Sequence, residues 1–310
     1  MSAAAEEDEV VLCASCGTAG SDGIKLKNCT ACYLVRYCSV KCQKDHRPRH
    51  KKECKKRAAE LRDELLFKQP ESSYLGDCPI CCLPLHLDPE KSFFMSCCSK
   101  SICDGCSYGN QKRAIDRRLQ EAECPFCRKA LPSTKDVLMK QLMKRIEVND
   151  PVAMCHTGKK RYEEGDYTAA FEYWSKAAAL GDVEAHNQLS LLYHKGEGVE
   201  KDEKKALHHL EQAAIGGHQE ARHNLGCVEA EPGTYDRSAK HFIIAAKLGH
   251  EKSLEEVKTL YTAGYVSKDD FAAALRGYKA AIDALKSPNR EKAAAFAVAL
   301  AERRRAPTRR

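Results

Sequence analysis

The placement of the cysteines is the feature that most constrains how this chain folds. Sixteen of the eighteen cysteines lie before residue 128, and ten of them form pairs separated by two residues. The pairs are Cys13/Cys16, Cys29/Cys32, Cys78/Cys81, Cys103/Cys106 and Cys124/Cys127. Two such turns together supply the four thiolates of a closed tetrahedral zinc site. The first 130 residues are therefore predicted to be zinc-built modules, whereas the remainder, with only Cys155 and Cys227, must fold by another route.

Length and composition favour several small domains in a reducing compartment. A chain of 310 residues has room for about two or three domains, and small modules with little apolar sequence need metal or disulfide staples. Residues 1–10 are acidic and lack the apolar centre of a secretory signal, and no run of about 18 apolar residues is present. We therefore expect a cytoplasmic or nuclear protein, without a membrane span, whose clustered thiols bind metal rather than form disulfides.

Two basic runs, residues 46–57 and 303–310, contribute to a net charge of +7. Basic runs can bind nucleic acid or anionic lipid through counterion release. More commonly they form solvated faces or tails, and no aromatic stacking platform accompanies them here. Nucleic acid is therefore not the expected partner of this chain.

Residues 11–57 contain eight metal-ligand candidates, enough for two sites of four ligands. Their spacing is C-x2-C, twelve residues, C-x2-C, five residues, C-x3-C, seven residues and H-x3-C. The last two pairs place their ligands at i and i+4 on one helix face, where both can reach one ion. His46 has the same relation to Cys42 and to His50, which makes it a rival ligand, although a solvent-facing position is favoured for it.

This spacing, with Tyr37 directly before Cys38, resembles the MYND-type zinc finger. The resemblance implies that the two ligand sets interleave along the chain. One zinc ion would be held by Cys13, Cys16, Cys38 and Cys42, and the other by Cys29, Cys32, His50 and Cys54. MYND fingers are mostly protein-interaction modules, several of which bind short proline-containing peptides. Some accompany a SET methyltransferase domain, but nothing after residue 57 resembles one, so methyl transfer is not expected.

Residues 75–132 contain three further C-x2-C pairs and the adjacent cysteines Cys97 and Cys98. Pro79 and Pro125 follow the first cysteine of their pairs and fix φ in the turn. A helix is predicted over 111–122, with a narrow apolar side formed by Ala114, Ile115, Leu119 and Ala122. Over its whole length this pattern resembles a RING finger.

The RING resemblance implies two cross-braced metal sites. One set would be Cys78, Cys81, Cys103 and Cys106, and three corners of the other would be Cys98, Cys124 and Cys127. Lys100 stands where a typical RING finger has a histidine ligand, and an ammonium group cannot bind zinc. We favour Cys97 as the fourth ligand, with a water or His86 as the alternatives. Cys82 is surplus and is expected to be a free thiol.

Many RING fingers are ubiquitin ligases, which hold a charged ubiquitin-conjugating enzyme in a reactive pose without forming a covalent bond to it. Three positions match residues through which RING ligases contact the conjugating enzyme and its ubiquitin. Ile80 corresponds to the apolar docking residue, Pro125 to the proline of the second docking loop, and Arg128 to the arginine that bridges enzyme and ubiquitin. Alternatively, Ile80 packs on its own zinc knuckle, the C-x2-C turn that holds two ligands, and Arg128 is an exposed charge. The tryptophan often found in the central RING helix is absent, since Trp174 is the single tryptophan.

Residues 151–290 are internally repetitive. The stretch 185–189 returns at 221–225, and the small-residue stretch 177–182 returns at 213–218 and again at 245–250. Glycines at such positions end one helix and turn the chain into the next, so the repeat predicts an α-solenoid with two helices per unit. Residues 191–221 resemble a Sel1-like repeat, a relative of the tetratricopeptide repeat, in three to four copies. Such arrays have no catalytic chemistry and present a groove to peptides or proteins.

The aromatic residues of the first repeat either line the groove or pack between helices. Packing between helices is favoured over lining the groove for most of Tyr162, Tyr167, Phe171, Tyr173 and Trp174. His208 and His209 lack metal-ligand companions and are expected to face solvent.

The predicted fold class is multi-domain, with two small zinc-stabilised α+β modules followed by an all-α helical-repeat solenoid. The segments are a disordered acidic N-terminus (1–10), a MYND-like finger (11–57), a helical linker (58–74), a RING-like finger (75–132), a linker helix (133–150), the repeats (151–290), and an alanine-rich helix with a basic tail (291–310) that is expected to be disordered from Arg303. About four zinc ions are expected. The leading hypothesis is a RING-type ubiquitin ligase whose repeats, with or without the MYND finger, select a protein substrate. The alternative is a non-catalytic adaptor.

Overall fold

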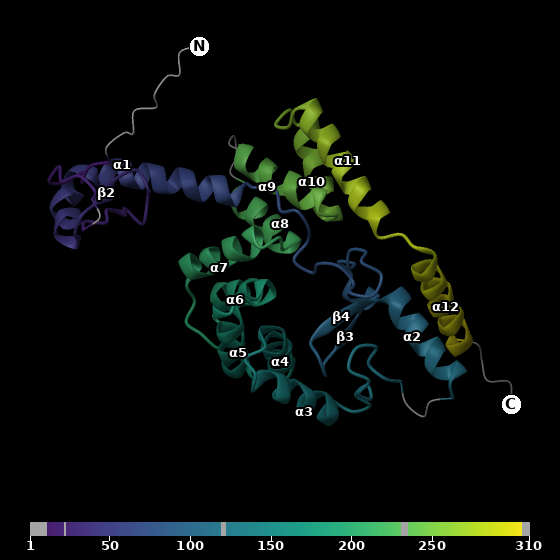
Figure 1. The fold of residues 1–310 in the computed structure, drawn as a ribbon. Coiled ribbons are helices and arrows are strands. Elements are labelled where there is room, and N and C mark those ends of the chain that lie inside the picture. The colour runs from purple at the N-terminus through teal and green to yellow at the C-terminus, as the bar shows by residue number, and fades with distance from the viewer. Residues whose placement is uncertain (1–10, 22, 119–121, 231–234, 306–310) are drawn as a thin grey trace, which may run out of the picture. The chain divides into compact units, whose positions relative to one another are not determined.

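The structure is a computed structural model that describes residues 11–21, 23–118, 122–230 and 235–305 (Figure 1). The chain divides into two compact units, Met1–Lys68 and Gln69–Arg310. Residues 1–10 and 306–310 lie outside the described part, so the disorder expected for them stays a prediction.

The first unit is a small α+β module built around one long helix. Strand β1 (Lys27–Asn28) pairs antiparallel with β2 (Arg36–Tyr37), and helix α1 runs from Val40 to Leu66. The hydroxyl of Ser39 caps α1 by accepting a hydrogen bond from the Cys42 amide. The sequence predicted a separate linker helix after residue 57, but the structure has one continuous helix. Ion pairs from Arg57 to Glu60 and to Glu64 lie across the predicted boundary and favour this continuity.

The second unit begins with the predicted RING-like segment. A short 3-10 helix η1 (Pro89–Lys91) leads into strand β3 (Ser92–Met95), which pairs antiparallel with β4 (Lys100–Cys103) and is followed by helix α2 (Asp104–Asp116). The small core of this segment is made of apolar side chains and buried thiols, namely Cys78, Leu85, Met95, Ile102, Cys103 and Cys124.

Helix α2 lies earlier in the chain than the prediction of 111–122. It begins at Asp104 because the sulfur of Cys103 caps it, accepting a hydrogen bond from the Cys106 amide. The predicted apolar side is also partly wrong, since Ala114 is buried but Ile115 is 74% exposed. Leu119 lies outside the described residues.

Helices α3 to α11 follow as a run of packed helices (Figure 1). Their bounds are α3 Lys135–Ile146, α4 Pro151–Glu163, α5 Tyr167–Ala179, α6 Val183–Lys195, α7 Glu203–Ile215, α8 Gln219–Val228, α9 Asp236–Lys247, α10 Glu251–Thr262 and α11 Lys268–Ala284. Each helix from α4 to α11 packs on the next one along the chain. Together with the first unit, this confirms the predicted fold class of small zinc-finger modules followed by a helical solenoid.

The repeated sequence uses the same chemistry at each helix junction. Gly181, Gly217 and Gly249 have φ of 87°, 86° and 90°, the left-handed region that glycine adopts at least cost. The next residue in each case caps the following helix with its side chain; these caps are Asp182, His218 and His250. The period seen in the sequence is therefore a repeated turn that ends one helix and starts another.

Small residues allow the two helices of a repeat to approach closely. A Cβ atom added to Gly158 of α4 would lie 2.6 Å from the indole nitrogen of Trp174 on α5. The equivalent pair in α8 and α9 is Gly226 and Phe242, also at 2.6 Å. Trp174 is 1% exposed, so it packs between helices as favoured by the sequence, whereas Tyr167 is 37% exposed.

The flanking helices differ in part from the prediction. Helix α3 lies within the predicted linker helix (133–150); it is capped by Thr134 and packs on α4, with Leu142 buried. Helix α12 (Pro288–Arg305) begins earlier than predicted and includes residues expected to be disordered. It packs against α2 of the RING-like segment. In the described part of the chain, no helix combines the length and apolarity needed to cross a bilayer.

Candidate metal centres

The structure gathers sixteen ligand side chains into four clusters of four. In the first unit the clusters are Cys13, Cys16, Cys38 and Cys42, and Cys29, Cys32, His50 and Cys54. In the second unit they are Cys78, Cys81, Cys103 and Cys106, and Cys97, Cys98, Cys124 and Cys127. Within each cluster the donor atoms lie within 4.8 Å of one another. None of the eighteen cysteines, all of which are described, is in a disulfide.

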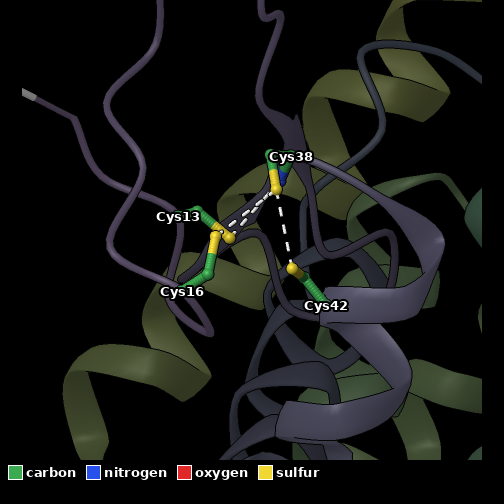
Figure 2. Close-up of side chains that lie close together, drawn as sticks. All are labelled: Cys13, Cys16, Cys38 and Cys42. Carbon is green, nitrogen blue, oxygen red and sulfur yellow. Dashed lines mark hydrogen bonds between the residues drawn. The ribbon is translucent and has the colours of Figure 1, made fainter.

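The spacing of the donor atoms fits tetrahedral zinc. Zn–S bonds of 2.3 Å in a tetrahedron place two sulfurs about 3.8 Å apart. Figure 2 shows the four sulfurs of the first cluster converging, with separations of 3.5 Å from Cys16 to Cys38 and from Cys38 to Cys42. In the other three clusters the sulfur separations are 3.7 Å for Cys29–Cys54, 3.7 Å for Cys81–Cys103 and 3.7 Å for Cys98–Cys124. The donor sets are therefore those of closed structural zinc sites.

Helix α1 supplies ligands to both sites of the first unit. Cys42 lies in its first turn, and His50 and Cys54 are one turn apart farther along. His46, the rival ligand, belongs to neither cluster. Its Nδ1 lies 3.0 Å from the Tyr37 hydroxyl and its ring stacks on that of His50, so it is half-buried rather than solvent-facing. His46 therefore supports a ligand instead of being one.

Four C-x2-C turns share one backbone arrangement. In each, the residue after the second cysteine has a positive φ and donates its N–H to the carbonyl of the first cysteine. These residues are Gly17 (73°), Tyr33 (57°), Cys82 (55°) and Arg128 (59°). The turn directs backbone N–H groups at the first sulfur, which prepares it to be a thiolate ligand.

The pKa values of the thiols show the effect of these N–H groups. The amides of Cys16 and Cys38 lower the pKa of Cys13 to about 6. Burial opposes the same effect at Cys29 and Cys78, but backbone donors still lower their pKa values to about 6 and about 7. In three clusters, therefore, one sulfur is set to be ionised near neutral pH, and in the fourth cluster backbone donors lower the pKa of Cys124 against the effect of burial.

The other sulfurs of a cluster have the opposite shift. Hydrogen bonds shared with Cys16 and Cys42 raise the pKa of Cys38 to about 12, and burial raises that of Cys54 to about 12. Four crowded sulfurs cannot all ionise without a compensating charge, and zinc supplies two positive charges when it binds. The clusters are thus suited to a divalent cation.

The structure places Cys97 at the corner that the sequence left open. Its sulfur lies 3.3 Å from that of Cys127, and the tight turn between β3 and β4 directs Cys97 and Cys98 into one cluster. His86 lies outside the cluster, with its Nδ1 accepting a hydrogen bond from the Asp88 amide. The ammonium group of Lys100 lies 4.5 Å from the centre of the Phe126 ring.

The three docking candidates lie next to these ligands with different exposure. Ile80 is 45% exposed between Cys78 and Cys81, so it does not simply pack on its own knuckle. Pro125 is half-buried, and Arg128 is exposed directly after Cys127. Cys82 is exposed and belongs to none of the four clusters.

One residue near the metal clusters was missed by the sequence reasoning. Arg290 of α12 has a guanidinium nitrogen 3.9 Å from the sulfur of Cys81. The two residues are 209 positions apart, and no motif links them.

The repeats contain no comparable chemistry among the described residues. A pocket of about 330 Å³ is lined by charges of both signs and one aromatic ring, from Arg161, Asp166, Ala169, Glu172, Tyr173 and Lys176. His208 is exposed as expected, but His209 is half-buried, with its Nδ1 2.9 Å from that of His186. Burial lowers the pKa of His209 to about 4, which corrects the solvent-facing prediction.

Family comparisons agree with two of the three predicted modules. Residues 13–54 match the family model of the MYND finger, and residues 151–182, 183–218 and 220–250 match that of the Sel1 repeat.

Individual relatives match shorter parts. HcpC of Helicobacter pylori strain J99, which its name describes as a candidate β-lactamase, is 41% identical over 56 residues, or 18% of this chain and 19% of HcpC. A Sel1 repeat protein of Oxalobacter formigenes is 27% identical with a TM-score of 0.42, covering 50% of this chain and 66% of that one. The antigen c5321 of uropathogenic Escherichia coli, with an SLR fold, is 23% identical with a TM-score of 0.41, covering 49% and 34%. The chain thus spans less than two thirds of each relative.

The chain combines a zinc-binding MYND finger with Sel1 repeats, both of which generally mediate protein–protein interactions.

Proposed function

We propose that residues 75–132 form a RING-type module and that the chain is a ubiquitin ligase whose repeats bind the protein substrate. The observation that carries the proposal is the interleaving of the two clusters in this segment. Cys78 and Cys81 share a cluster with Cys103 and Cys106. Cys97 and Cys98, which lie between these pairs, share the other cluster with Cys124 and Cys127. Such cross-bracing holds the two knuckle loops in fixed positions beside α2.

The candidate docking residues support this proposal. Ile80 exposes 45% of its surface at the tip of the first knuckle, although a large aliphatic side chain gains from burial. Arg128 occupies a left-handed position with φ of 59°, which glycine would occupy at lower cost. An exposed apolar residue in one knuckle and an arginine in a left-handed conformation at the end of the other are consistent with a surface kept for a partner.

A ligase of this kind would act by orientation alone. The docked conjugating enzyme carries ubiquitin as a thioester, and the arginine fork can donate to acceptors on both proteins at once. No residue of the module needs to act as a nucleophile. Ubiquitin would pass from the conjugating enzyme to a lysine of the substrate held by the repeats.

The non-catalytic adaptor remains the second candidate because of one specific observation. Helix α12 packs on α2, the helix that would help to form the docking surface. Asn110 of α2 is also held in place, since its side-chain amide donates to the Glu123 carbonyl. In an adaptor the same surfaces would bind proteins without transferring ubiquitin.

Autoubiquitination with a broad panel of conjugating enzymes tests the proposal. We expect activity that falls at least about tenfold in Ile80→Ala and in Arg128→Ala, because each removes a contact to the charged enzyme. Arg276→Ala, at an exposed arginine of α11 outside the RING-like segment, serves as the control and should keep activity. Zinc content should stay the same in all three variants. Activity that is absent across the panel, or unaffected by both substitutions, would favour the adaptor.

A further inference from the structure

The N-terminal part of helix α12 is anchored in the RING-like segment by a buried arginine. Arg290 is only 8% exposed. One terminal nitrogen of its guanidinium, Nη2, donates to the Pro84 carbonyl at 2.8 Å and to the Leu83 carbonyl at 3.4 Å. The other, Nη1, donates to the Leu285 carbonyl at 2.9 Å. The side chain therefore links the end of the repeats to the first knuckle loop.

The backbone around Arg290 is in equally close contact with α2. A Cβ atom added to Gly105 would lie 2.8 Å from the Arg290 nitrogen and 2.9 Å from the Asn289 carbonyl carbon, so only glycine fits there. Farther along the two helices, the rings of Tyr108 and Phe296 are 5.3 Å apart. Helix α12 is thus docked on the RING-like segment along more than one turn.

The charge of Arg290 has no carboxylate partner among the described residues. An arginine is always ionised in a protein, and a buried charge is unfavourable unless an opposite charge lies nearby. The nearest anionic candidates are the ligand sulfurs, with Nη2 3.9 Å from the sulfur of Cys81. Four thiolates and one zinc ion carry a net charge of about −2, so a metal-loaded cluster supplies the missing counter-charge.

We propose that Arg290 is the counter-ion of the zinc cluster formed by Cys78, Cys81, Cys103 and Cys106, and that it couples zinc binding at this cluster to the docking of α12. Zinc binding fixes four thiolates beside Arg290, and the resulting negative charge attracts the guanidinium more strongly. By linkage, the docked guanidinium raises the affinity of the cluster for zinc by the same factor. This coupling does not depend on ubiquitin transfer.

The first test measures how fast each cysteine of the full-length chain is alkylated by iodoacetamide in the presence of a zinc chelator. Substituting groups that support metal ligands typically costs about 10- to 100-fold in metal affinity. We therefore expect alkylation of the four cysteines in this cluster to be about 10- to 100-fold faster in Arg290→Gln. Arg290→Lys, which keeps the charge but loses the planar fork, should give an intermediate rate.

Two internal comparisons keep this result specific. Arg276→Gln, an exposed arginine on α11, should behave like the wild-type chain. The cysteines of the MYND finger belong to the other unit and should keep their rates in every variant. Unchanged rates for the cluster of Cys78 in Arg290→Gln would overturn the proposal.

A second test uses the wild-type chain and so does not depend on how a variant folds. Chelator is added stepwise while hydrogen exchange of residues 288–300 and alkylation of the cluster are followed together. We expect α12 to lose amide protection in step with the four cysteines becoming reactive. If α12 stays protected after these cysteines have been modified, the coupling does not exist.

Discussion

Single residues in left-handed conformations stand directly after four of the five C-x2-C pairs; the fifth pair, Cys103/Cys106, lies at the start of α2. The left-handed conformation costs a residue with a Cβ atom about 1–2 kcal/mol, whereas glycine adopts it with little strain. Gly17 fits this rule, but Tyr33, Cys82 and Arg128 do not. These three side chains are therefore present at some cost to the stability of their modules.

Cys82→Gly is expected to stabilise the RING-like segment by up to about 1 kcal/mol, because the strain at φ of 55° is removed while the flexibility of the unfolded chain increases slightly. Thermal unfolding of the second unit measures the change. Cys82→Ser keeps the Cβ atom and should leave the unfolding temperature as it is. Metal analysis should return the same zinc content for both variants, and a loss of one zinc ion would show that Cys82 is a ligand.

The structure brings the predicted ligand candidates together in four clusters, because cysteine spacing reports directly on local turns. The sequence favoured Cys97 over His86 and a water for the last corner, but the reason for its position, the way the β3–β4 turn directs two adjacent sulfurs, is visible only in the structure. His209 was misjudged for a similar reason. Its environment is set by His186 on the preceding helix, which no local pattern reveals.

Helix pairs of the repeats depend on small residues at their crossing points. At the crossing of α4 and α5, the indole N–H of Trp174 donates to the Cys155 carbonyl at 3.1 Å, directly above Gly158. A methyl group at residue 158 would have to displace this ring and break its hydrogen bond. The close approach therefore stabilises the pair only while the position stays small.

Gly158→Ala should destabilise the repeats by about 1–2 kcal/mol, because overpacking in a core exceeds the gain of roughly 1 kcal/mol in helix propensity. Urea unfolding followed by circular dichroism measures the difference. The matched control is Gly109→Ala on α2, where an added Cβ meets open space and the propensity gain alone should remain. Equal effects of the two substitutions would mean that the crossing is not tightly packed.

At the level of elements, the repeat period and the helix junctions followed from the sequence because each junction carries its own glycine and cap. The bounds of α2 and the continuity of α1 did not. The start of α2 depends on the Cys103 sulfur acting as a cap, and the continuity of α1 depends on ion pairs that cross a boundary drawn from motif spacing.

Within the second unit, the RING-like segment and the residue directly before it, Tyr74, contact the repeats at several separate points. The Tyr74 hydroxyl donates to Glu184 at 2.7 Å, and the same carboxylate lies 2.9 Å from Nε2 of His218. Elsewhere, the ring of Phe94 on β3 stacks on that of His156 on α4 with a centroid distance of 3.7 Å. These contacts hold Tyr74 and the RING-like segment against α4, α6 and the start of α8.

The His156 contact predicts a pH-dependent stability of this unit. Burial, together with the nearby Lys159, lowers the pKa of His156 from 6.5 to about 4, while Glu184 and Asp150 oppose the shift. The folded state therefore binds fewer protons than the unfolded state below pH 6.5, and stability falls as the pH decreases towards 4. At pH 5.5 the loss relative to pH 7.5 should be on the order of 1 kcal/mol.

Thermal unfolding of the second unit between pH 7.5 and 5.5 tests this prediction in a range above the acid that strips zinc from thiolates. His156→Phe keeps an aromatic ring against Phe94 but cannot be protonated. The variant should lose the part of the pH dependence that comes from His156, about 1 kcal/mol, and keep the part that comes from His209, whose pKa burial also lowers to about 4. A wild-type slope that persists in the variant would assign the effect to another group.

The modular plan of the whole molecule was predictable, but the way its parts attach was not. Each module carries its own local signature of cysteine pairs or repeats. Contacts such as Phe94 with His156 and Arg290 with the first knuckle join residues far apart in the chain, and they depend on three-dimensional packing alone.

The anchoring of α12 has a consequence for how the protein is made. A ribosome adds about 5 to 20 residues each second, and Arg290 follows Cys81 by 209 residues. Roughly 10 to 40 s therefore pass during translation between the emergence of the first knuckle and the arrival of its arginine. Throughout that interval the nascent knuckle must hold its metal without its last stabilising neighbour, so the finished polypeptide retains zinc more firmly than the growing one.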